Sequence, residues 1–164
     1  EKLLQRPDWT DAMRMYRESG LLDEVDHPMW EDPAAVRTLL ATVPVKVLVH
    51  ALGFMRARSR RDPGYLLRLN DINATLLGLQ RHESAEVREA FMYLLGTTVL
   101  WPEDVHTLEP FLAVDYVDTQ SSILDEFVRR HEIPHDLDRV RELAKSRDES
   151  VRLWAKELLE RAGQ

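Results

Sequence analysis

Two stretches of the sequence, residues 84–95 and 148–159, are nearly alike and lie 64 positions apart. The first reads SAEVREAFMYLL and the second DESVRLWAKELL, so that a Val-Arg pair recurs near the start and a Leu-Leu pair at the end. We interpret the spacing as two steps of 32, because a period between 20 and 50 residues is typical of solenoid proteins. No single unit of such a chain can bury its own apolar face, and neighbouring units therefore have to stack.

A middle copy is found by adding 32 to each position of the first copy. It has drifted in part, because Gln120 stands at the position of Arg88 and Glu126 at that of Leu94. Four columns nevertheless stay apolar in all three copies: Leu76, Leu108 and Val140; Leu79, Phe111 and Leu143; Phe91, Ile123 and Ala155; Leu95, Phe127 and Leu159. These columns favour a true repeat over chance matches between amphipathic helices.

The repeat resembles the HEAT family of helical hairpins. The resemblance covers roughly residues 66–164 and rests on Leu76–Arg88, Leu108–Pro110–Phe111 and Leu143–Arg152, with Pro110 at the place of the family's kinking proline. It implies a curved, all-α, right-handed superhelix of the solenoid type, and it implies no particular partner. The sequence departs from the family six positions before the arginine, where an acidic residue is common, since His82 and Ser146 stand there.

Cap and turn residues predict the other helices. Thr10 and Gly20 bound a first helix, and Asp32-Pro33 begins another. Residues 45–61 follow helical spacing over about 17 positions, and Asp62-Pro63-Gly64 forms a turn. We therefore expect about nine helices, no strand and a single domain over residues 1–164, with degenerate capping helices over 1–65 and HEAT-like hairpins over 66–98, 102–131 and 136–164. Trp9 and Trp30 are expected to pack the end of this domain. Phe91, Met92 and Tyr93 are interpreted as core, with Met92 and Tyr93 flanking the apolar stripe, where they could face the next repeat.

The composition excludes several classes of protein. Apolar residues make up 44% and charged residues 31%, which is typical of a globular chain. The absence of cysteine excludes disulfides and thiolate zinc sites. The sequence has no apolar run of the roughly 18 residues that a membrane span requires, and no signal peptide opens it, so we expect a cytoplasmic protein without membrane contact.

Two histidine patterns suggest metal chemistry, and we assign neither to a metal. Residues 131–135, HEIPH, match the HExxH letters of zinc proteases, but Pro134 disfavours the helix that would bring both histidines to one face. The pairs His82-Glu83 and His131-Glu132 are superficially similar to those of the deoxyhypusine hydroxylases, which are HEAT-type iron enzymes. The pairs lie 49 residues apart, which does not fit the period, and that family needs four of them. We expect no cofactor and no catalytic residue.

The function that we predict is a non-catalytic scaffold or adaptor that binds a protein or peptide on the curved surface of a solenoid. We expect the densest basic cluster and one position on each second helix to face the partner: Arg56, Arg60 and Arg61, with Arg88, Gln120 and Arg152. The alternative is a nucleic-acid-binding protein, such as a HEAT-like glycosylase for alkylated DNA bases, which uses the same arginines as a basic groove. Residues 33–90 carry 9 basic and 5 acidic side chains, but the whole chain has a net charge of −7, which disfavours nucleic acid.

Overall fold

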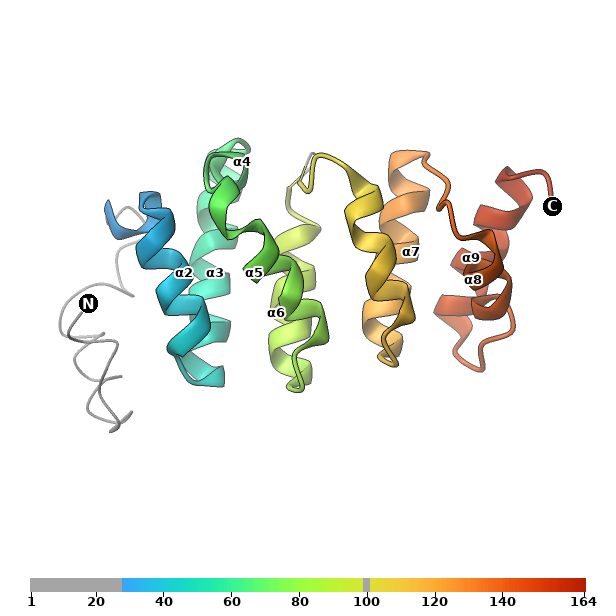
Figure 1. Cartoon of the computed structure of the whole chain (residues 1–164), viewed down its shortest axis with the longest axis horizontal. Coiled ribbons are helices and arrows are strands. Elements are labelled where there is room, and N and C mark those ends of the chain that lie inside the picture. Colours follow the sequence, from blue (N-terminus) through green and yellow to red (C-terminus); the bar gives the residue numbers. More distant parts are fainter. Residues whose placement is uncertain (1–27, 99–100) are drawn as a thin grey trace. The chain divides into compact units, whose positions relative to one another are not determined.

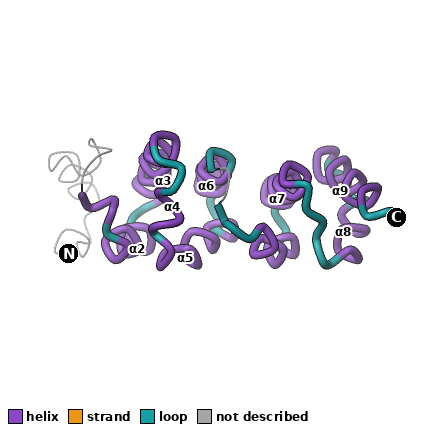
Figure 2. The backbone as a smooth tube through the Cα atoms, turned by 90° about the horizontal axis from the view of Figure 1, so that it is seen from above, coloured by secondary structure: helices purple, strands orange, loops and turns teal. Residues whose placement is uncertain are grey.

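A computed structural model describes residues 28–98 and 101–164. The helix predicted between Thr10 and Gly20, and Trp9, lie outside these residues. The described part of the chain is helical and contains no strand, as the sequence predicted (Figure 1, Figure 2). The chain divides into two compact units, residues 1–101 and residues 102–164, which are described separately below. Among the helices of the described ranges, none is both long enough and apolar enough to cross a membrane.

The described part of the first unit contains two helical pairs. In the first pair α2 (Pro33–Thr42) follows the short 3₁₀ helix η1 (Pro28–Glu31) and precedes α3 (Val45–Arg61). In the second pair the first arm is broken into four short helices: α4 (Tyr65–Arg68), η2 (Asn70–Ile72), α5 (Asn73–Gly78) and η3 (Leu79–Arg81). The second arm is α6 (Ala85–Leu95), which packs against α3.

Trp30 is fully buried in this unit, as predicted for it. Its indole stacks on Phe54 of α3, with 5.7 Å between the ring centroids. Its backbone carbonyl accepts a hydrogen bond of 2.8 Å from the hydroxyl of Tyr65, which joins the start of the described chain to α4. A second buried indole, Trp101, lies edge-on to Phe91 of α6 and donates to Asn73 of α5. Large aromatic side chains therefore close both pairs of the unit.

The second unit also consists of two helical pairs. The first pair is η4 (Val105–Ala113) with α7 (Val117–Arg130), and the second is α8 (Leu137–Leu143) with α9 (Glu149–Arg161). α7 packs against both η4 and α9. The carboxylates of Asp136 and Asp148 accept backbone N–H groups in the first turns of α8 and α9 and so cap both helices.

The arm before α7 differs from the prediction in its start and in its type. The sequence placed its first turn at Pro102, whereas the helix begins at Val105, after Asp104 accepts the N–H of His106. It is a 3₁₀ helix over nine residues. Pro110 supplies the physical reason, because a proline inside an α-helix lacks one hydrogen bond and clashes with the carbonyl four residues earlier.

The four apolar columns with a spacing of 32 residues face the core in both units. Their twelve side chains are buried, except that of Leu159, which is half-buried. The drifted position Glu126 is buried as well, where its equivalents are leucines. Its carboxylate lies 2.5 Å from Arg130 and also pairs with Arg129, so that the charge in the core is neutralised.

Candidate functional site

The six side chains predicted to face a partner fall into two groups. The group on the second helices bonds within its own hairpin, because each member donates to a carbonyl six residues earlier. Arg88 donates to His82 at 2.7 Å, Gln120 to Val114 at 2.7 Å, and Arg152 to Ser146 at 3.1 Å. Both arginines also donate to the next carbonyl along, at 2.9 Å and 3.3 Å.

These three hydrogen bonds tie the start of each second helix to the loop that precedes it. Arg88 is only 8% exposed and Gln120 only 6%, whereas Arg152 is half-buried. The resembled family often has an acidic residue at positions 82 and 146. Here the backbone carbonyls of these two residues accept the hydrogen bond from the arginine instead. The sequence analysis missed this internal role, although the 32-residue spacing had already placed the three side chains in one column. Contact between these residues and a partner stays a prediction.

The second group lies on α3, where Arg56 meets an aromatic ring of α6. The Arg56 guanidinium lies 5.0 Å from the centroid of the Tyr93 ring. Tyr93 is 53% exposed, which corrects its interpretation as a core residue, and its hydroxyl donates to Glu89 at 3.1 Å. Arg60 and Arg61 are exposed at the end of the same helix. We call Arg56, Arg60, Arg61 and Tyr93 the basic–aromatic patch.

Acidic side chains neutralise the arginines that neighbour this patch. Arg58 pairs with Glu31, and its guanidinium lies 5.0 Å from the Tyr65 ring centroid. Arg68 pairs with Asp62 at 2.5 Å and with Glu31 at 3.6 Å. The bond from Arg68 lowers the pKa of Asp62 below its usual range, and the same bond raises the pKa of Arg68. Glu31 and Asp62 thus form an acidic margin beside the patch.

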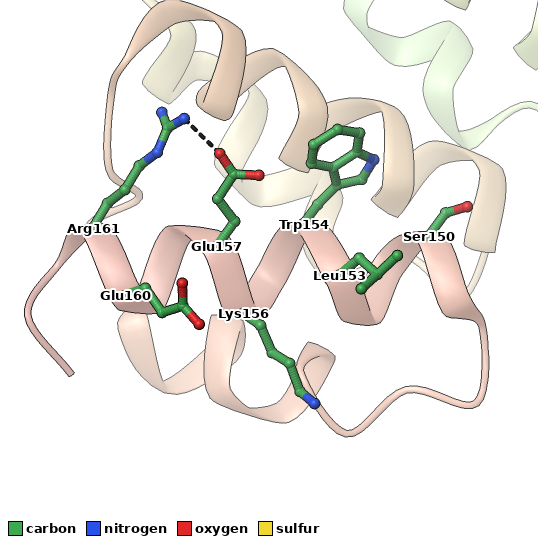
Figure 3. A pocket seen from close by; sticks show the side chains of 7 residues that line it. All are labelled: Ser150, Leu153, Trp154, Lys156, Glu157, Glu160 and Arg161. Atoms are coloured by element: carbon green, nitrogen blue, oxygen red, sulfur yellow. Dashed lines mark hydrogen bonds and ion pairs between the residues drawn. The ribbon is translucent and has the colours of Figure 1, made fainter.

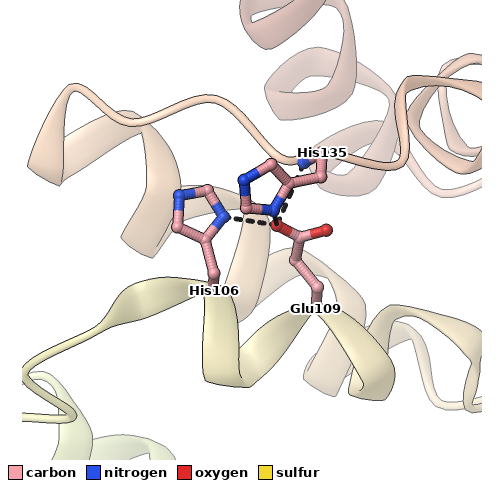
Figure 4. A group of neighbouring side chains, drawn as sticks. All are labelled: His106, Glu109 and His135. Carbon is pink, nitrogen blue, oxygen red and sulfur yellow. Dashed lines mark hydrogen bonds and ion pairs between the residues drawn. The ribbon is translucent and has the colours of Figure 1, made fainter.

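A cluster of two imidazoles and one carboxylate lies in the second unit (Figure 4). His106 and Glu109 both come from η4, where side chains three residues apart eclipse each other because a 3₁₀ helix has three residues per turn. His106 Nδ1 pairs with Glu109 Oε1, and His135 Nδ1 lies 3.0 Å from the same oxygen. The two imidazole rings are tilted by 32° to each other, with 3.9 Å between their centroids.

The loop between α7 and α8 brings His135 to this cluster. α7 ends at Arg130 and is followed by the cap residue His131, which adopts the left-handed conformation with φ of 59°. The loop then passes through the buried Pro134. The backbone N–H groups of His135 and Asp136 donate to the Glu109 carboxylate at 3.0 and 3.4 Å. Burial acts to raise the pKa of Glu109, but the bonds from His106 and from these two N–H groups outweigh it and lower the pKa.

This arrangement separates the two histidines of the HExxH letters, as Pro134 predicted. His131 lies beside Arg161, whose guanidinium is 3.5 Å from its Nδ1, while His135 joins His106 and Glu109. One ligand atom from each of these three residues lies within 4.8 Å of the others. Glu132 is near, with 3.9 Å between its carboxylate and His106 Nε2. The sequence analysis missed His106 and Glu109, although their spacing of three on a proline-containing helix was a usable signal.

The outer face of α9 carries an open depression with a volume of about 850 Å³ (Figure 3). Leu153 and Trp154 form its apolar part, and Leu153 is exposed. Arg161 bonds to Glu157 at 2.5 Å and to the carbonyl of Val128 at 2.8 Å, which fixes the charged end of the depression to α7. This surface offers apolar contact on the last helix of the second unit.

Comparison of the chain with protein-family models, with curated proteins and with solved structures found no match.

Proposed function

We propose that this chain is a non-catalytic interaction scaffold of the cytoplasm, built as a HEAT-like solenoid, which binds an acidic segment of a protein partner at the basic–aromatic patch. The repeat is supported by the common role of positions 88, 120 and 152, each of which bonds to a carbonyl six residues earlier. The burial of the apolar columns supports it as well, because stacked repeats bury equivalent positions.

The observation that carries the proposed binding site is the stacking of Arg56 on an exposed tyrosine. Tyrosine and arginine are enriched among the residues that contribute most to protein interfaces. The ring at position 93 lies on α6 and the guanidinium comes from α3, so two packed helices present them together. Because Tyr93 is half in solvent while Arg56 already covers part of its face, a partner can bury the rest of the ring and pair its carboxylates with the arginines.

The choice of a protein partner over a nucleic acid follows from the surrounding charges. Glu31 and Asp62 neutralise the arginines next to the patch, so the basic surface does not extend as a continuous track for a phosphate backbone. The net charge of −7 also repels a polyanion at long range. A short acidic peptide can pair its carboxylates with Arg56 and Arg60, which lie four residues apart on α3, while it covers the ring of Tyr93.

We expect replacement of Arg56, Arg60 and Arg61 by alanine to weaken the binding of an acidic peptide about 30-fold or more, because several charge-assisted contacts are lost together. The probe is a fluorescein-labelled acidic peptide selected on the wild-type protein from a random 12-residue display library, and fluorescence anisotropy measures its Kd. Tyr93→Ala alone is expected to weaken the same peptide about tenfold. Circular dichroism checks that both variants keep their helicity.

The matched control replaces Arg141, Lys145 and Arg147 by alanine, because these exposed residues of the second unit remove the same charge. We expect this control to change the Kd by less than about threefold. Equal weakening by both triple variants would show that only net charge matters and would overturn the patch. Tight binding of a 20-base-pair DNA duplex, with steep salt dependence and loss in the arginine variant, would replace the protein partner by the nucleic-acid alternative.

A further inference from the structure

We propose that His106, Glu109 and His135 bind one divalent transition-metal ion, with zinc as the ion that this set of donors fits best. Two imidazoles and one carboxylate form a three-ligand set that leaves one coordination position open on a tetrahedral ion. The atoms that would bind the ion already converge, since one from each side chain lies within 4.8 Å of the other two. This site is in the second unit and is independent of the basic–aromatic patch.

The three side chains point at one another because of the backbone that carries them (Figure 4). The 3₁₀ geometry of η4 aligns His106 with Glu109, and Pro110 within the helix favours that geometry. The hydrogen bonds from the backbone of His135 and Asp136 to Glu109 hold the loop against η4. The ligand set is therefore assembled before any ion arrives, so that little ordering of the chain opposes binding.

The distances lie close to those of a metal centre. Ligand atoms about 2.1 Å from a tetrahedral ion are about 3.4 Å from one another. His135 Nδ1 and Glu109 Oε1 are 3.0 Å apart, so this pair has to open by only a few tenths of an ångström. His106 Nδ1 is closer still to the same oxygen and has to move in the same direction. The ion would replace the hydrogen-bonding protons between the Glu109 oxygen and the two imidazole nitrogens.

A role confined to packing does not account for the His135 side chain. Glu109 holds the loop through backbone N–H groups, which any residue at position 135 would supply. The His135 side chain itself is 77% exposed, yet the centroid of its ring lies 3.9 Å from that of the His106 ring. The Glu109 side chain, by contrast, is only 14% exposed. An exposed imidazole beside a half-buried carboxylate and a second imidazole suits an ion that is reached from solvent.

Glu132 lies beside the ring nitrogen of His106 that faces away from Glu109, where a carboxylate can orient a ligating imidazole. Its carboxylate lies 3.9 Å from His106 Nε2, and its side chain is 56% exposed. As a nearby anion it would lower the energy of a divalent cation without having to ligate it directly. The donors of nitrogen and oxygen type, with no thiolate, suit zinc and also accept nickel or cobalt.

The test uses the full chain, stripped with EDTA and titrated with Zn²⁺ in an isothermal calorimeter. We expect one ion per chain with a Kd below about 10 μM, and at least about a 30-fold weaker Kd for His106→Ala and for His135→Ala. His131→Ala is the matched control, because this histidine lies in the same connection, belongs to the same HExxH letters and is outside the cluster. Its Kd is expected to stay within about twofold of the wild-type value.

His135→Ala is the decisive variant, because its exposed side chain can be removed without emptying a core. Circular dichroism verifies its folding. In addition, ¹⁵N-resolved spectra of the histidine rings are expected to shift on zinc addition at positions 106 and 135 and to stay unchanged at 131. The proposal is overturned if the wild type shows no saturable binding below about 10 μM, if His135→Ala keeps the wild-type Kd, or if His131→Ala weakens binding as much as His135→Ala does.

Discussion

Replacing Trp30 by alanine is expected to lower the free energy of unfolding by about 4 kcal/mol. The Trp30 side chain has no exposed surface and stacks on Phe54. The hydroxyl of Tyr65 donates a hydrogen bond to the backbone carbonyl of Trp30. Truncation removes a large apolar contact and leaves a cavity that helices η1, α2 and α3 cannot fill by collapse, because their side chains already meet around it.

Urea denaturation followed by far-UV circular dichroism measures this loss. The matched control is Trp154→Ala, since Trp154 is only half-buried in the open depression of α9 and is expected to cost about 1 kcal/mol or less. A loss below 1 kcal/mol at Trp30, or equal losses at the two tryptophans, would contradict the packing role of Trp30.

The second large effect is expected at Arg88, whose replacement by methionine should cost about 3 kcal/mol of unfolding free energy. Methionine keeps much of the side-chain length and its contacts, so the change isolates the guanidinium. This group donates to the carbonyls of His82 and Glu83 at 2.7 and 2.9 Å while only 8% of the residue is exposed. Its removal leaves two loop carbonyls without these charge-assisted bonds.

The equivalent positions provide graded controls for this prediction. Arg152→Met is expected to cost about 1 kcal/mol, because Arg152 is half-buried and its bonds are longer, at 3.1 and 3.3 Å. Gln120→Met is also expected to lower the free energy of unfolding by about 1 kcal/mol, since the neutral amide donates one hydrogen bond, to the carbonyl of Val114. Chemical denaturation of the three variants gives the order, and a loss at Arg152 as large as that at Arg88 would show that burial does not set the cost.

The helices could be predicted from the sequence because the signals for them are local. The period of 32 residues identified the equivalent positions that form the buried columns. Within each copy, residues three and four positions apart share a helix face. Asp32 marked a helix start because a cap bonds to the turn directly after it. The consequence of Pro110 was identified only in part: a kink was expected, whereas the arm is a 3₁₀ helix and begins three residues later.

The candidate sites depend on residues that are far apart in the sequence, and only the tertiary structure decided which of them meet. Arg56 stacks on Tyr93 because α3 packs on α6, and nothing near either residue encodes that crossing. His135 meets His106 rather than His131 because α7 ends at residue 130 and the following loop folds back onto η4. The sequence by itself determined which residues are helical and which face is apolar, because those properties repeat with the turn of a helix. The partners of polar side chains depend on loop paths and helix packing, which no local pattern specifies.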